Sequence, residues 1–177
     1  MTLASGIAAF EAKQFSRALQ LLTPNAQIGN SEAQYRVAVM CQNGLGQVRI
    51  EASAYRWMKD AADQGYGLAL HGLGCKYLDG DCTGQDDQQA VACFEKAVDL
   101  GFEGSMLALA QMYQQGRGVV QNTVKARLLY AQAGFDPTDR ADHSYYRRPP
   151  PSISRISFRM TVSLSTAFHR SRSARSR

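Results

Sequence analysis

The chain has 177 residues, of which 45% are hydrophobic, and no run of residues approaches the roughly 20 apolar positions that a membrane-spanning helix needs. Its net charge of +5 comes from residues 138–177, which hold nine arginines and two acids, while residues 1–137 hold 11 basic and 13 acidic residues. These values fit one globular domain of ordinary size and exclude a body that binds nucleic acid through a basic surface.

The N-terminal segment does not resemble a secretory signal. Glu11 and Lys13 lie within its first 15 residues, and no basic segment there precedes an apolar run. We therefore expect a cytoplasmic protein. Cysteines stay reduced in that compartment, and no two here have the short spacing of a zinc knuckle. The cysteines are Cys41, Cys75, Cys82 and Cys93.

The first predicted element is a helix pair over about residues 3–30. A first helix around Gly6 and Phe10 is followed by a tight turn and then by a second helix that contains Phe15 and Ala18. This pair resembles a tetratricopeptide repeat.

Most of the sequence repeats itself at an interval of 36 residues. Alanines and glycines recur at this interval in several series. The series are Ala18, Ala54, Ala90 and Ala126; Gly44, Gly80 and Gly116; and Gly29, Gly65 and Gly101. One interval shared by so many positions predicts structural repeats at about residues 31–66, 67–102 and 103–136.

Each repeat is predicted to form two amphipathic helices. In the first repeat, apolar residues fall at steps of three and four, as in Ala33, Val37 and Met40, and the same steps recur after Ala54. Glycines such as Gly44 stand where each helix should end. One helix pair cannot bury its apolar face alone, so we expect the pairs to stack into an all-α solenoid.

The third repeat contains the pattern Leu-Ala-x-Met-Tyr-x-x-Gly-x-Gly-Val over residues 109–119, followed by Lys125 and Ala126. This pattern resembles the Sel1-like repeat, a subclass of the tetratricopeptide superfamily, and residues 55–65 are similar to its second helix. The resemblance covers about residues 5–136. It implies a right-handed α/α superhelical solenoid of helix-turn-helix repeats that acts as an adaptor in a macromolecular complex.

One turn departs from the pattern. Cys82 stands where the other repeats have Gly46 and Gly118, so we expect the turn after Gly80 to be reshaped.

The resemblance also implies where a partner would bind, because the first helix of each pair lines the concave face of such solenoids. The expected contact positions are equivalent in the three repeats. They are Tyr35, Val39, Gln42 and Asn43; His71, Cys75, Leu78 and Asp79; and Leu107, Gln111, Gln114 and Gln115. This set mixes apolar and amide groups and has almost no charge, which suits an extended peptide or a helix.

Two residue patterns could suggest a metal or a catalytic site. His71 and Cys75 can share one helix face, but a metal needs a further ligand and a catalytic pair needs an activated thiolate. Asp79 and Asp81 open a stretch like an EF-hand calcium loop, whose twelfth residue is Ala90 instead of the required Glu. We therefore expect no catalytic residue, no metal and no cofactor.

The repeat pattern fails near Pro137, and residues 137–177 are predicted to be a disordered tail rich in Arg, Ser and Pro. Three consecutive prolines, residues 149–151, exclude a helix there. Two interpretations stay open. The segment is either a genuine basic tail that contacts acidic partners or the product of a shifted reading frame, which its many arginines without a single lysine suggest.

The sequence therefore predicts a non-enzymatic adaptor that binds a protein or peptide of unknown identity. The alternative is an enzyme or small-molecule-binding repeat protein that acts on cell-wall-derived compounds, although the cysteine-rich branch linked to that role has a regular disulfide in each repeat. A third interpretation is a regulatory domain of a bacterial envelope or signalling complex. If the last helix pair lacks a cap, we also expect self-association through Leu128, Leu129 and Tyr130.

Overall fold

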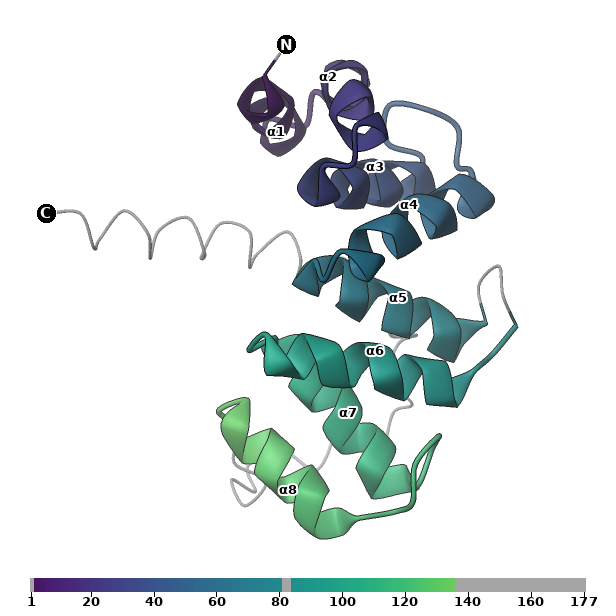
Figure 1. Ribbon diagram of the computed structural model, residues 1–177, viewed down its shortest axis with the longest axis vertical. Coiled ribbons are helices and arrows are strands. Elements are labelled where there is room, and N and C mark those ends of the chain that lie inside the picture. The colour runs from purple at the N-terminus through teal and green to yellow at the C-terminus, as the bar shows by residue number, and fades with distance from the viewer. Residues whose placement is uncertain (1, 81–83, 136–177) are drawn as a thin grey trace, which may run out of the picture. The chain divides into compact units, whose positions relative to one another are not determined.

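The computed structural model describes residues 2–80 and 84–135, which form eight α-helices and no strand (Figure 1). The helices are α1 (Leu3–Glu11), α2 (Phe15–Gln27), α3 (Ser31–Asn43), α4 (Glu51–Asp63), α5 (Gly67–Asp79), α6 (Asp87–Asp99), α7 (Glu103–Gln115) and α8 (Thr123–Gln132). Each helix packs mainly against the helices before and after it, as stacked repeats require. The predicted α/α superhelical solenoid is therefore confirmed.

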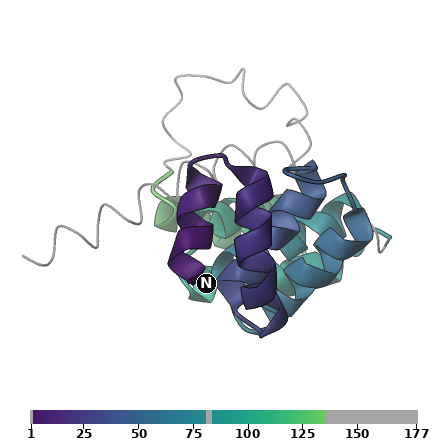
Figure 2. The same cartoon turned by 90° about the horizontal axis from the view of Figure 1, so that it is seen from above.

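The helices alternate between two structural roles. We call α1, α3, α5 and α7 the first helices, and α2, α4, α6 and α8 the second helices. The short turn that contains Lys13 joins α1 to α2, and Figure 2 shows these two helices side by side at the N-terminal end. Longer turns join the two helices of the later repeats, as predicted.

Helix ends follow from polar side chains and glycines. The side chains of Asn30, Asp86 and Asn122 accept hydrogen bonds of 2.9–3.0 Å from backbone N–H groups three residues ahead, at the starts of α3, α6 and α8. The first helices α3, α5 and α7 each end at a glycine with left-handed backbone. These glycines are Gly44, Gly80 and Gly116.

A second glycine in the longer turns allows close contact between repeats. Gly46 and Gly118 have φ angles of 74° and 68°. A Cβ atom at Gly118 would lie 2.5 Å from the backbone oxygen of Asp87, and one at Gly46 would lie 2.6 Å from the backbone of Phe15. Each turn therefore packs against the start of the preceding second helix. The equivalent residue Cys82, with its predicted reshaped turn, lies outside the described residues.

Arg117 strengthens the same junction in the last repeat. Its Nε donates to Asp87 Oδ2 at 3.0 Å, and its Nη2 donates to the carbonyl oxygen of Leu78 at 3.2 Å and lies 2.9 Å from Asp87 Oδ1. Burial opposes ionisation of Asp87, yet the hydrogen bonds from Arg117 and Gln85 lower its pKa. One guanidinium thus ties the third turn to α5 and α6.

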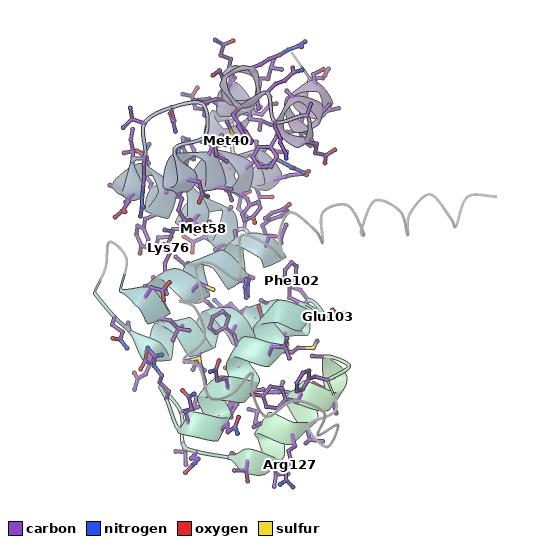
Figure 3. All side chains as sticks on the ribbon, turned by 180° about the vertical axis from the view of Figure 1, so that it is seen from behind. Met40, Met58, Lys76, Phe102, Glu103 and Arg127 are labelled. Carbon is purple, nitrogen blue, oxygen red and sulfur yellow. The ribbon has the colours of Figure 1, made fainter. Side chains whose placement is uncertain are left out.

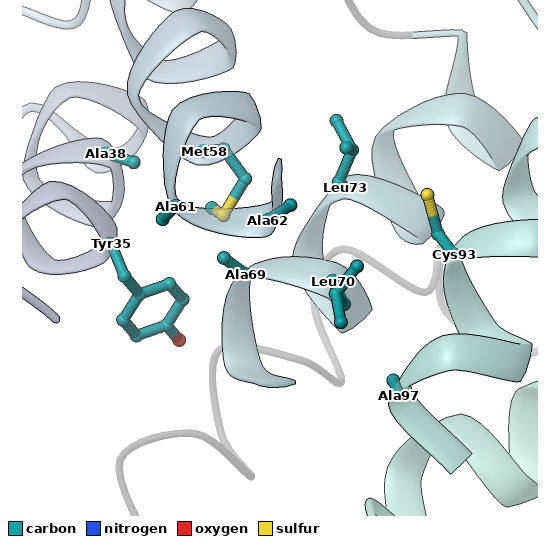
Figure 4. Close-up of a cluster of buried hydrophobic side chains, with 10 residues drawn as sticks. All are labelled: Tyr35, Ala38, Met58, Ala61, Ala62, Ala69, Leu70, Leu73, Cys93 and Ala97. Atoms are coloured by element: carbon teal, nitrogen blue, oxygen red, sulfur yellow. The ribbon is translucent and has the colours of Figure 1, made fainter. Parts of the chain in front are cut away.

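Small side chains let the helices approach closely in the core. Figure 4 shows the central cluster, which draws residues from α3, α4, α5 and α6. Its members are Tyr35, Ala38, Met58, Ala61, Ala62, Ala69, Leu70, Leu73, Cys93 and Ala97. Half of them are alanines, so the larger side chains fill the space between closely spaced helices.

One core position carries an unexpected charge. Met40, Lys76 and Met112 are separated by 36 residues, and their exposed fractions are 0%, 3% and 3%. No hydrogen bond or ion pair of the Lys76 ammonium is found within residues 2–80 and 84–135. Lysine is rarely buried without a partner. The second repeat therefore uses a lysine where its neighbours use methionine.

Residues 136–177, which include the predicted basic tail, lie outside the described residues. In the part that the structure describes, no helix has both the length and the apolar character needed to cross a membrane.

Candidate functional site

The candidate partner-binding residues all lie on α3, α5 and α7, and they differ in exposure. The buried ones are Tyr35, His71, Cys75 and Leu78. The half-buried ones are Val39, Gln42, Leu107 and Gln111. The exposed ones are Asn43, Asp79, Gln114 and Gln115. The half-buried and exposed residues present the side-chain surface that a partner could contact.

The structure brings His71 and Cys75 together, on the shared helix face that the sequence predicted. The Nε2 atom of His71 lies 3.8 Å from Sγ of Cys75, and its Nδ1 atom lies 2.9 Å from Oγ of Ser105 on α7. The imidazole also lies against two aromatic rings, with centroid distances of 5.6 Å to Phe94 and 6.3 Å to Phe102. The cluster therefore joins α5 to α6 and α7.

Burial keeps this imidazole neutral. It lowers the pKa of His71 from 6.5 to about 4, because a charged ring would lose its hydration there. At neutral pH the ring supplies no positive charge to stabilise a thiolate at Cys75. The geometry favours a packed His and Cys over a catalytic pair. Among the described residues, no group of three or more His, Cys, Asp or Glu side chains is placed to hold a metal ion.

Two aromatic pairs recur at the repeat interval along the starts of the first helices. Tyr35 pairs with Tyr66 at a centroid distance of 5.4 Å, and His71 pairs with Phe102 at 6.3 Å. Tyr66 and Phe102 are half-buried, and each lies just before a first helix. They are not among the candidate residues predicted from the sequence, although their spacing of 36 residues marks them as equivalent positions. They extend the candidate surface toward this edge of the repeats.

Charged side chains divide unequally between the two sets of helices. Among the described helices, every exposed Lys or Arg belongs to a second helix. These cations are Arg17, Arg56, Lys59, Lys96, Lys125 and Arg127. The charged side chains that the first helices expose or half-expose are all acidic, namely Glu11, Glu32, Asp79 and Glu103.

The two cations of the first helices are buried. Lys76 occupies the core position described above. Arg36 lies over the ring of Phe10 at 5.2 Å, and its Nη2 is 2.9 Å from Oε1 of Glu32 and 3.8 Å from Oε1 of Glu11. The guanidinium is therefore engaged within the fold, so the charge that the first helices present outward is negative.

The last second helix carries exposed apolar side chains. Val124 and Leu128 on α8 have exposed fractions of 67% and 59%, whereas Leu129 is buried and Tyr130 is half-buried. Leu128 is equivalent to Arg56 and Ala92, which are also exposed. Of the residues predicted to promote self-association, Leu128 is thus the one that lies open at the surface.

Comparison with known families matches the Sel1 repeat to residues 31–66, 67–102 and 104–134. A putative Sel1-like repeat-containing protein of Acanthamoeba polyphaga mimivirus is 24% identical over 112 residues, which are 61% of this chain and 21% of that protein. The chain thus spans about a fifth of the length of this relative.

Two solved structures are similar to the chain. A Sel1 repeat protein from Oxalobacter formigenes is 31% identical, with a TM-score of 0.62 over 67% of this chain and 89% of that one. The protective antigen c5321 of uropathogenic Escherichia coli is 29% identical, with a TM-score of 0.64 over 66% of this chain and 25% of that one. The recurring helix pairs are thus shared with bacterial proteins of this fold.

Proposed function

Because the chain belongs to the Sel1 repeat family, we propose that it is a non-enzymatic scaffold that binds a protein or peptide partner through α3, α5 and α7. The Sel1-repeat fold is typical of protein-interaction scaffolds. We call the surface formed by these three helices the first-helix face.

One observation carries this proposal. Equivalent positions on α3 and α7 leave apolar and amide side chains half-buried or exposed at the surface, with Val39 and Gln42 on α3 and Leu107, Gln111 and Gln114 on α7. Of the equivalent positions on α5, Asp79 is exposed and the other three are buried. Amide groups can hydrogen-bond to an extended backbone, and the apolar groups offer surface to bury. A repeated surface of this kind suits a partner that contacts several repeats at once.

A comparison of the free energy of apolar burial with the cost of association favours a contact that extends over several repeats. Completing the burial of a partly exposed Val39 or Leu107 contributes less than the roughly 1.5–3 kcal/mol of a fully buried aliphatic side chain. Association costs at least about 4 kcal/mol in lost translational and rotational freedom. A partner held by one repeat would therefore bind weakly, so the proposal requires contacts from both α3 and α7.

A pair of matched double variants tests the proposal. Val39→Gln with Leu107→Gln changes the first-helix face, and Val124→Gln with Leu128→Gln makes the same chemical changes on the second helix α8. Each is compared with the parent chain in affinity capture from cells of the source organism. Circular dichroism and thermal unfolding establish that both variants keep the fold.

We expect that the parent and the α8 variant both capture the partner and that the first-helix variant does not. A partner that survives the first-helix changes, or that only the α8 changes remove, would refute the assignment of the face.

A further inference from the structure

The outward charges of the first helices are all acidic, and we propose that the partner presents a cationic segment, with Lys or Arg among apolar residues, to the first-helix face. This inference rests on the proposed function and adds the chemical class of the partner. It goes beyond the apolar and amide contacts already described, because it predicts which charge the partner carries.

The charge distribution is the first support. On α3, α5 and α7, which form the first-helix face, Glu32, Asp79 and Glu103 are exposed or half-exposed, and the cations Arg36 and Lys76 are buried. Arg36 offsets part of this charge, because it pairs with Glu32. Complementary charges steer association and select between partners. An acidic segment would face repulsion here, and a cationic one would face attraction.

Aromatic rings beside the carboxylates are the second support. Glu32 lies close enough to Tyr66 to contribute to the pKa of that phenol, which burial chiefly raises to about 12. Phe102 immediately precedes Glu103, and Figure 3 shows both residues at the start of α7. The Tyr66 ring thus lies near the Glu32 carboxylate, and Phe102, one repeat further along, is followed directly by Glu103. A Lys or Arg side chain can pack its methylene stem on such a ring and pair its head group with the acid.

Attraction of such a segment would be local and would not follow from net charge. The whole chain carries +5, so a cationic peptide gains nothing from the total charge. The exposed lysines and arginines of the second helices would repel it. Binding of a cationic segment must therefore depend on the acids of the first-helix face.

The test uses the full chain and two labelled peptides. In one peptide Lys alternates with Leu, and in the other Glu replaces every Lys. Fluorescence anisotropy measures both affinities at low and at physiological salt, for the parent and for two charge-reversed variants. Glu103→Lys changes the first-helix face. Glu95→Lys is the matched control on α6, where the equivalent residue of α4 is already a lysine, Lys59.

We expect the Lys–Leu peptide to bind more tightly than the Glu–Leu peptide, and to bind more tightly at low salt than at physiological salt. Glu103→Lys should weaken its binding about ten-fold or more, because it places like charges together, while Glu95→Lys should change it less than about two-fold. Equal affinity for both peptides, absence of binding by both, or equal effects of the two substitutions would overturn it.

A failure of the cationic-partner inference can be distinguished from a failure of the proposed function. A captured partner that depends on Val39 and Leu107 but is indifferent to Glu103→Lys would leave the scaffold in place and remove the cationic partner.

Discussion

Acidification should destabilise this protein through His71. Folding lowers the pKa of this imidazole from 6.5 to about 4, so between these values the unfolded chain binds a proton that the folded chain excludes. Stability is therefore complete above pH 6.5 and falls as the pH drops toward 4. Because one pKa step corresponds to about 1.4 kcal/mol, the free energy of unfolding should fall by about 2 kcal/mol between pH 7 and pH 5.

Urea unfolding at pH 7 and at pH 5 measures this loss, and His71→Leu provides the comparison. Leucine occupies the equivalent position in the third repeat, Leu107. The variant leaves the buried Ser105 hydroxyl without the imidazole, so it should be less stable than the parent at pH 7 by about 1–3 kcal/mol. Between pH 7 and pH 5 the variant should nevertheless lose about 2 kcal/mol less stability than the parent, because it lacks the imidazole, whereas the carboxylates titrate in both proteins. If both proteins lost the same stability between the two pH values, the buried neutral imidazole would not be the cause.

Three further predictions follow from the packing. Lys76→Met should raise the free energy of unfolding by about 1–2 kcal/mol, because it replaces a lysine whose side chain is buried in the core by the residue that both neighbouring repeats carry; an unchanged or lower melting temperature would contradict this. Gly118→Ala should cost about 2–4 kcal/mol, since it adds a clash with the Asp87 backbone to the strain of a positive φ. Gly84→Ala, with φ of 73° and no atom of the described residues within 4 Å of its added Cβ, should cost about 1–2 kcal/mol; equal losses in chemical denaturation would remove the role of the close contact. Val124→Gln with Leu128→Gln should shift the full chain from self-associated species toward monomer in light scattering, and a parent that is already monomeric would count against an adhesive α8.

The helix pairs could be predicted from the sequence because they depend on local chemistry repeated at a fixed interval. Gly44 and Gly116 end helices through their own backbone freedom, and the steps of three and four in apolar residues place the buried side of each helix. The contact between His71 and Cys75 was predictable for the same reason, since four residues span about one helical turn.

The exposure of individual candidate residues could not be predicted in this way. Periodicity places Tyr35 and His71 at equivalent surface positions, but their burial depends on rings that lie further along the same repeat, namely Tyr66, Phe94 and Phe102. The division of charge between first and second helices could not be predicted for a related reason. Arg36 and Lys76 count as surface cations in the sequence, and only tertiary packing buries them.

The most direct test of the central claim is site-specific photo-crosslinking to the captured partner. A photoreactive side chain is placed at Gln42 or Gln111 on the first-helix face, and in matched proteins at Ala52 or Ala92, which are exposed on α4 and α6. We expect crosslinks to the partner from Gln42 and Gln111 and none from the alanine positions. Crosslinks from Ala52 and Ala92 in place of the first-helix positions would show that the partner binds the second helices, and the account would be wrong.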